Sequence, residues 1–225
     1  MLGNVEFEKE LTHCFMRQLH SIIKINTFWS ASSKSGSAYL QPMKQLLSKA
    51  ANGRIILFLS GLVLFFNLYL FPSTAVKYEG TDLQPLDLRM GYSKEDVMDL
   101  FTKMGTEGRN SYSYGLNVID SIYPFVYTAL LILLLVFFIN KLELSNPNWS
   151  FFIILPALIM LADFIENRIV TAMLKSYPII KHSTAAFGSA ATTAKWILTM
   201  VTVLLLFTAI IALAVRFIRQ RKPLN

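Results

Sequence analysis

The sequence of 225 residues contains one cysteine and few charged residues. Cys14 alone cannot form an intramolecular disulfide or a C-x-x-C redox pair. Asp, Glu, Lys and Arg make up 16% of the chain, whereas apolar and aromatic residues make up 54% and the mean hydropathy is +0.47. This balance argues against an ordinary water-soluble domain, in which about 25% of residues are charged.

The sequence also lacks the short motifs of common soluble enzymes. It contains no phosphate-binding glycine loop, no H-E-x-x-H zinc motif and no G-x-S-x-G nucleophile elbow. The three histidines, His13, His20 and His182, form no pair that would face the interior of a membrane. We therefore predict no metal site and no cofactor, haem included.

Four long stretches are almost free of charge. Each is close to the ~20 residues that a helix needs to cross about 30 Å of hydrocarbon. They cover residues 55–76, 119–140, 149–174 and 196–217. The sequence therefore predicts an all-α integral membrane protein built as a four-transmembrane-helix bundle.

The basic residues are distributed unevenly around these stretches. Residues 1–54 carry seven Lys or Arg against three acids, and Arg216, Arg219, Arg221 and Lys222 follow the last stretch. The loop 77–118 carries five basic and seven acidic residues. Because Lys and Arg accumulate on the cytoplasmic side of membranes, we expect both termini inside and this loop outside. The formal charge of +7 is then a sign of orientation and of contact with lipid head groups, and not of nucleic-acid binding.

The predicted outer loop contains neither a cysteine nor an N-x-S/T acceptor. Four-span proteins of animal cell surfaces usually stabilise such a loop with disulfides. These absences favour the cytoplasmic membrane of a bacterium, with the chain as a multi-pass protein of the cell membrane. We divide it into a cytoplasmic segment 1–54, a membrane domain 55–217 and a basic cytoplasmic tail 218–225.

The N-terminal segment is predicted to begin with an amphipathic helix. Apolar residues recur at helical spacing between Phe7 and Ile23, opposite Glu8, Arg17 and Lys24. Such a helix can lie on the inner leaflet, pack on the cytoplasmic ends of the spans or bind a partner. A Ser-rich linker at 30–37 follows, and then a short helix over about residues 39–49.

The outer loop contains the signals of a short helix. Ser93 and Asp96 resemble a capping arrangement, and an i, i+3, i+4, i+7 apolar stripe runs from Val97 to Met104. Gly105 is expected to end this helix, and the turn-forming residues 108–115 to follow as irregular chain. A second outer loop is predicted at about residues 175–195.

Ionisable residues inside the third span are the clearest candidates for a functional site. Such residues cost roughly 2.5–3.5 kcal/mol each on insertion scales, so they are suspects by default. Asp163, Glu166 and Asn167 share one broad helix face in the outer half of this span. Other polar residues cluster at the outer helix ends, and Arg109 and Tyr112 of the loop are expected to close the top. The predicted ligand-binding residues are Asp163, Glu166, Asn167, Lys195, Asp120, Tyr123, Tyr127, Arg109 and Tyr112.

Three functions are consistent with this constellation. The favoured one is a site that opens outward and binds, or helps transport, a cation, a small polar molecule or a lipid head group. The second is an accessory or structural subunit of a membrane complex, or a homo-oligomer, in which the charges only fix helix register. The third is an intramembrane acid/base enzyme on a lipid-soluble substrate, in which Asp163 or Glu166 transfers the proton. No catalytic residue can be assigned from the sequence, which argues against the third.

Overall fold

The computed structural model describes residues 36–79, 81–144 and 149–221. The predicted amphipathic helix, with its apolar positions from Phe7 to Ile23, lies outside the described residues, as do residues 222–225 of the tail. The first described helix is α3, Gly36–Ala50, which agrees with the helix expected before the first span.

Four described helices are long and apolar enough to cross a membrane. The first combines α4, Gly53–Phe65, with a π-turn at Phe66–Leu70 and a 3-10 turn at Pro72–Thr74. The others are α6, Tyr123–Leu142, α7, Trp149–Ser176, and α8, His182–Arg221. Their length and composition confirm the prediction of an all-α membrane protein with four spanning helices.

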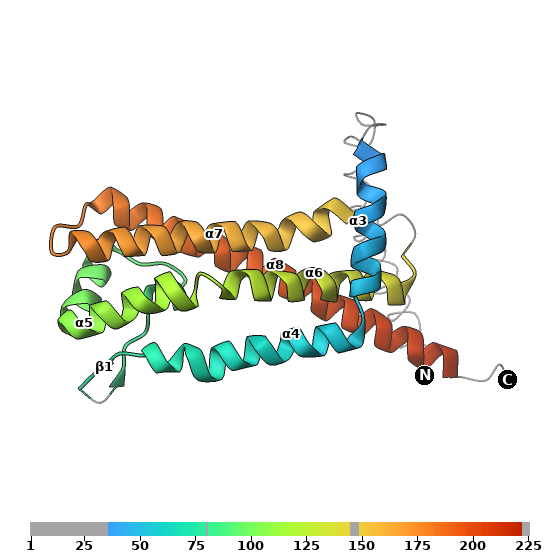
Figure 1. Cartoon of the computed structure of the whole chain (residues 1–225), viewed down its shortest axis with the longest axis horizontal. Helices are drawn as coiled ribbons and strands as arrows, with labels where there is room; N and C mark the ends of the chain where they lie inside the picture. The colour runs from blue at the N-terminus through green and yellow to red at the C-terminus, as the bar shows by residue number, and fades with distance from the viewer. Residues whose placement is uncertain (1–35, 80, 145–148, 222–225) are drawn as a thin grey trace, which may run out of the picture.

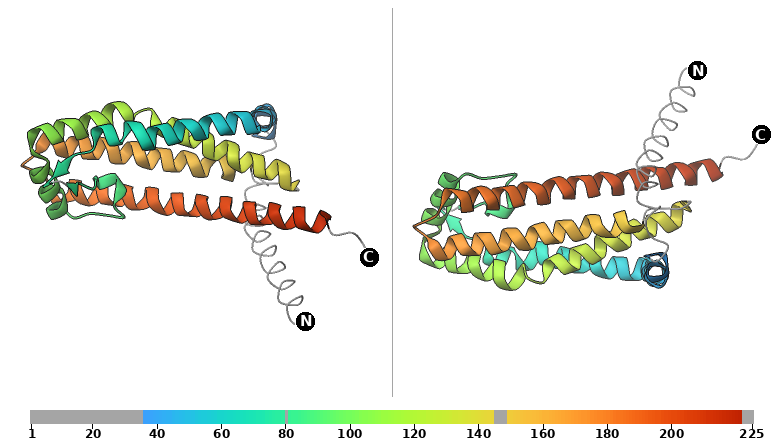
Figure 2. Two further views of the ribbon diagram at one scale, coloured as in Figure 1. Left: turned by 90° about the horizontal axis from the view of Figure 1, so that it is seen from below. Right: turned by 90° about the horizontal axis from the view of Figure 1, so that it is seen from above.

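These helices form an elongated bundle with two different ends (Figures 1 and 2). Helix α7 packs along α8 and α6, and α4 packs on α6. We call the end that contains α5 and the turn between α7 and α8 the loop end. At the opposite end, the α3 end, helix α3 crosses the direction of the bundle (Figure 1).

The chain between α4 and α6 folds over the loop end. It forms a small antiparallel hairpin of β1, Lys77–Tyr78, and β2, Thr81–Asp82, in which Lys77 pairs with Asp82. A 3-10 turn at Leu86–Leu88 and helix α5, Lys94–Tyr114, follow. The predicted cap is confirmed as a full capping box, because Ser93 and Asp96 exchange side chain–backbone hydrogen bonds.

The chain after Gly105 is helical, and the prediction of irregular structure over residues 108–115 was wrong. Gly105 adopts φ 63°, a conformation that L side chains rarely tolerate, and it bends α5 without ending it. The second half of α5 packs Gly108 close to Val76 and buries Tyr112, so tertiary contacts offset its turn-forming composition. A π-turn at Gly115–Ile119 then leads toward α6.

The predicted extent of the second outer loop, about residues 175–195, was also wrong. The loop is shorter, because α7 ends at Ser176 and α8 already begins at His182. This part of α8 is rich in small residues that allow close packing. Ala185 is fully buried, and a Cβ on Gly188 would lie 3.0 Å from Ile169 of α7. The largest cluster of buried apolar side chains lies here, between α5, α7, α8 and the 3-10 turn, and includes Leu86, Phe101 and Met173.

Candidate functional site

Three charged side chains from α7 and α8 meet near the loop end. The Lys195 ammonium lies 3.1 Å from Oδ1 of Asp163 and 2.5 Å from Oε2 of Glu166. Glu166 is fully buried and Asp163 nearly so. The structure thus brings together the three residues that the sequence placed at the centre of the site, and it joins them in direct ion pairs.

Hydroxyl groups complete the shell around these two carboxylates. Tyr127 of α6 donates to Oδ2 of Asp163 at 3.0 Å, and Thr192 of α8 donates to Oε1 of Glu166 at 2.5 Å. Each carboxylate therefore has one cationic and one hydroxyl partner. Thr192 did not stand out in the sequence, but it precedes Lys195 by three residues and so lies close to it on α8.

Asp120 and Asn167 form a second pair beside the first. Asn167 donates from Nδ2 to Oδ2 of Asp120 at 2.8 Å, and both side chains are buried. Oδ1 of Asn167 has no hydrogen-bond partner among the described residues. Asp120 precedes the spanning helix, which begins at Tyr123 and not at residue 119 as the sequence suggested. Burial, together with the negative charge of Asp163, raises the pKa of Asp120 to about 7.

Asp87 is a fourth carboxyl group of this region, and it is not among the residues predicted from the sequence. Tyr112 donates to its Oδ1 at 3.2 Å, and Trp196 donates from Nε1 to its backbone oxygen at 3.0 Å. Burial raises the pKa of Asp87, and the positive charge of Lys195 offsets part of this shift. The available signal was an acid between two leucines, Leu86 and Leu88, which is weak in a loop with seven acids.

The remaining predicted residues lie at the edge of the site or outside it. Tyr123 accepts a hydrogen bond from Asn67 of α4 at 2.9 Å and makes a T-shaped ring contact with Tyr127. Tyr112 reaches the site through Asp87. Arg109 instead donates to the backbone oxygen of Phe101 at 2.8 Å and lies 4.5 Å from the centre of the Tyr177 ring. Arg109 therefore contacts α5 and Tyr177 and not the carboxylates of the site. Among the described residues, Lys195 is the one cation that pairs with these carboxylates.

We call Asp87, Asp120, Asp163, Glu166 and Lys195 the carboxyl cluster. It contains four acids and, in the described part of the chain, one ammonium group, which pairs with Asp163 and Glu166. Within the same described residues, no group of three or more His, Cys, Asp or Glu is arranged to hold a metal ion. With four acids and one cation, the cluster is suited to bind protons or a further cation.

Comparison of the chain with protein-family models, with curated proteins and with solved structures finds no match.

Proposed function

We propose that this membrane protein binds a cation, or the positively charged group of a small polar molecule, at the carboxyl cluster and helps to transport it. The observation that carries this proposal is the charge balance of the cluster. Lys195 neutralises at most one of four acids. Buried carboxylates without a counter-charge are costly, so the remaining groups must take up protons or a cation.

Asp120 is the residue that we expect to respond first to a ligand. Its only side-chain partner among the described residues is the neutral amide of Asn167, whereas Asp163 and Glu166 contact an ammonium group. The free Oδ1 of Asn167 adds an acceptor beside it. Because its pKa is raised to about 7, the ionised fraction of Asp120 increases as the pH rises from 6 to 8. Cation binding is therefore expected to strengthen as the pH rises through 7.

Thermal unfolding in detergent tests this proposal with defined probes. Sodium, potassium, methylammonium and guanidinium chlorides are compared with N-methylglucamine chloride at equal ionic strength, at pH 6 and pH 8. At least one small cation should raise Tm, more strongly at pH 8. A cation at a concentration 100 times its Kd would raise the free energy of unfolding by about 2.7 kcal/mol.

Two variants make the thermal test specific. Asp120→Asn should remove the cation response at both pH values. Asp99→Asn is the matched control, because Asp99 is an exposed acid of α5 that pairs with Lys103 at 2.8 Å. Equal melting curves in all salts, or an unchanged response in Asp120→Asn, would contradict the proposal.

We also propose that the loop end faces outward, that both termini are cytoplasmic and that the membrane is the bacterial inner membrane. The excess of Lys and Arg in 1–54 and after residue 215 supports this orientation. Glu107 of α5 and Lys49 of α3 are exposed residues near opposite ends. In a Cys14→Ser background, Glu107→Cys should react with an impermeant maleimide in intact cells, and Lys49→Cys only after permeabilisation. The reverse pattern would invert the orientation.

A structural role of the cluster is the competing interpretation. It is favoured by the direct contact between Lys195 and both of its acids, which leaves no space for a ligand between them. In that case the cluster would fix the register of α7 against α8, as expected for an accessory subunit. The stability measurements proposed below separate this role from ligand binding.

A further inference from the structure

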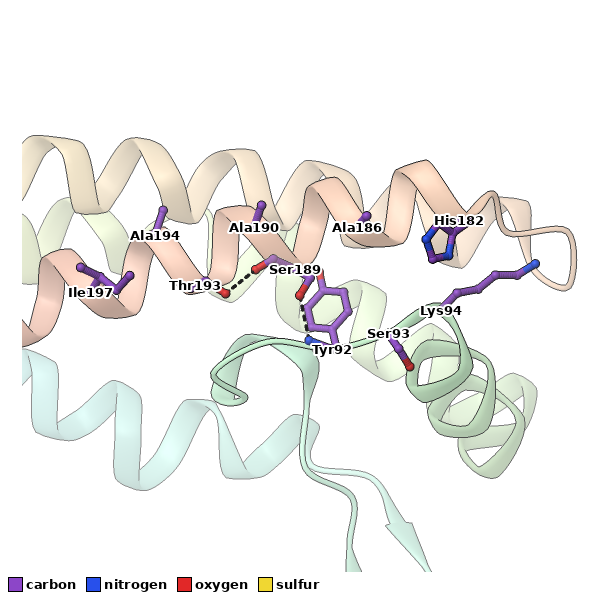
Figure 3. A pocket seen from close by; sticks show the side chains of 10 residues that line it. All are labelled: Tyr92, Ser93, Lys94, His182, Ala186, Ser189, Ala190, Thr193, Ala194 and Ile197. Atoms are coloured by element: carbon purple, nitrogen blue, oxygen red, sulfur yellow. Dashed lines mark hydrogen bonds between the residues drawn. The ribbon is translucent and has the colours of Figure 1, made fainter.

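A groove on the outer face of α8 contains none of the residues of the carboxyl cluster. It has a volume of about 570 Å³ and lies between the first half of α8 and the segment that leads into α5 (Figure 3). This volume is within the range of roughly 300–1,000 Å³ that is usual for small-molecule sites. Its lining residues are Tyr92, Ser93, Lys94, His182, Ala186, Ser189, Ala190, Thr193, Ala194 and Ile197.

The wall of the groove is held in place by hydrogen bonds to α8. Ser189 accepts from the backbone N–H of Tyr92 at 2.8 Å, and Thr193 donates to the backbone oxygen of Met90 at 2.8 Å. The ring of Tyr92 is buried against α8. The groove is therefore preformed, which lowers the entropic cost of binding.

The floor of the groove is an apolar stripe on one face of α8. Ala186, Ala190, Ala194 and Ile197 follow one another at helical spacing. The same face continues into the spanning part of α8 as Val201 and Leu204, which are 40% and 62% exposed. The groove is thus continuous with a surface that faces lipid tails, so a hydrocarbon chain can enter it from the bilayer.

One end of the groove carries the ammonium group of Lys94 and the imidazole of His182. Lys94 and His182 lie together at this end, opposite Ile197 (Figure 3). Within the described residues neither of them forms an ion pair. His182 and Ile197 are about 22 Å apart along the helix at 1.5 Å per residue, which is comparable with the length of one long acyl chain.

We propose that the groove binds a long-chain fatty acid, with its chain along the alanine stripe and its carboxylate between Lys94 and His182. The apolar floor, its continuity with the lipid-facing side of α8 and the unpaired ammonium of Lys94 beside the His182 imidazole support this ligand. A single acyl chain fits the single stripe, and the Lys94 ammonium and the N–H of the His182 imidazole can donate to the two oxygens of a carboxylate. This site is separate from the carboxyl cluster and does not depend on the cation-binding proposal.

Photo-crosslinking tests the site in its membrane setting. The protein is reconstituted in phosphatidylcholine nanodiscs and labelled with palmitate that carries a diazirine near the end of its chain. Mass spectrometry should place the label on α8 between Ala186 and Ile197. Unlabelled palmitate should compete, whereas hexadecanol, which lacks the charge, and lysophosphatidylglycerol should compete less well. Equal competition by palmitate and hexadecanol would overturn the proposal, as would stronger competition by the lysophospholipid.

Variants separate the two parts of the site. Ala190→Trp fills the groove and should abolish labelling of this segment, while Ala214→Trp, at an exposed alanine of α8 outside the groove, should not. Lys94→Gln together with His182→Gln should weaken competition by palmitate by about three- to tenfold, as expected for the loss of one exposed ion pair and one hydrogen bond. Lys77→Gln is the matched control, because Lys77 is an exposed cation of the loop end outside the groove. Unchanged labelling in Ala190→Trp would show that the fatty acid lies elsewhere.

Discussion

The two ends of the bundle use the same kinds of interaction in opposite surroundings. At the loop end, Lys195 pairs with Asp163 and Glu166, and the side chains are 12%, 6% and 0% exposed. At the α3 end, Arg216 pairs with Glu143 at 2.7 Å, but these side chains are 32% and 74% exposed. Their geometry is similar, and their burial is not.

The apolar packing differs in the same direction. The loop end has an extensive buried core, whereas the α3 end has a small cluster around Ala51, Leu133 and Val136. Helices α4 and α8 expose most of their apolar side chains. In a membrane, lipid would contact these exposed side chains, so contacts within the chain are more extensive at the loop end than at the α3 end. The buried charged cluster therefore lies near the end that has the larger apolar core.

The largest difference between the two ends is expected when their ion pairs are broken. Lys195→Met leaves Asp163 and Glu166 buried without a counter-charge, which typically destabilises by about 3–5 kcal/mol. Arg216→Met removes an exposed pair, and the expected loss is about 0–1 kcal/mol. Thermal unfolding of both variants in detergent measures the difference. Equal losses would show that burial of the Lys195 pair does not set its contribution.

A double variant decides whether the buried pair is structural or functional. If the cluster fixes helix register, Asp163→Asn should restore part of the stability that Lys195→Met removes, because one unpaired charge disappears. If the cluster is a ligand site, Glu166→Gln should abolish the response to cations while the protein still inserts and folds. A large loss of stability in Glu166→Gln, Asp163→Asn and Lys195→Met, with partial restoration in the double variant, would favour the structural role.

The fold was predictable where a single physical property dominates. The four spans follow from length and hydropathy, and the start of α5 follows from Ser93 and Asp96. The structure of the loops was not predictable, because tertiary contacts determine whether these segments are helical. The chain around Gly108 has a turn-forming composition but packs on Val76, and the small residues around Gly188 form a helix because they pack against Tyr92 and Ile169.

The candidate site was predictable in part for the same reason. An acid inside an apolar span is costly wherever it faces lipid, so Asp163 and Glu166 stand out from sequence alone. Asp87 and Arg109 lie in a loop where charges are ordinary. Only the folded path of that loop shows that Asp87 approaches the cluster and that Arg109 turns toward Phe101 and Tyr177.

Removing one hydroxyl group at each end of the bundle tests the same difference in burial, with a smaller expected effect on stability. Tyr112 accepts from the backbone N–H of Leu86 and donates to Asp87, and burial raises its pKa well above the usual range, so it stays protonated. Tyr112→Phe removes both of these buried hydrogen bonds, at an expected cost of about 1–3 kcal/mol. Ser48→Ala at the α3 end removes an exposed hydrogen bond from Asn140 and should cost less. Equal costs in denaturation experiments would mean that the loop end is no better shielded from water.

Removing one helix cap at each end of the bundle has the smallest expected effect on stability. The contributions of the two caps differ in their dependence on pH. Ser93 caps α5 at the loop end, and Asn52 caps α4 at the α3 end by accepting from the N–H groups of Arg54 and Ile55. Replacing either cap by alanine should cost about 1 kcal/mol at pH 7. The backbone N–H and hydroxyl of Ser93 lower the pKa of Asp96, so the contribution of this carboxylate is full above its ordinary pKa.

The capping box at Ser93 should therefore weaken in acid. As the pH falls through the lowered pKa of Asp96, its carboxylate is protonated and the difference between the wild-type protein and Ser93→Ala should shrink. The Asn52 cap contains no titratable group, so the cost of Asn52→Ala should not depend on pH. Unfolding of both variants between pH 7 and pH 3, each measured against the wild-type protein at the same pH, tests this. A pH-independent cost for Ser93→Ala would show that the Asp96 carboxylate adds nothing to the cap.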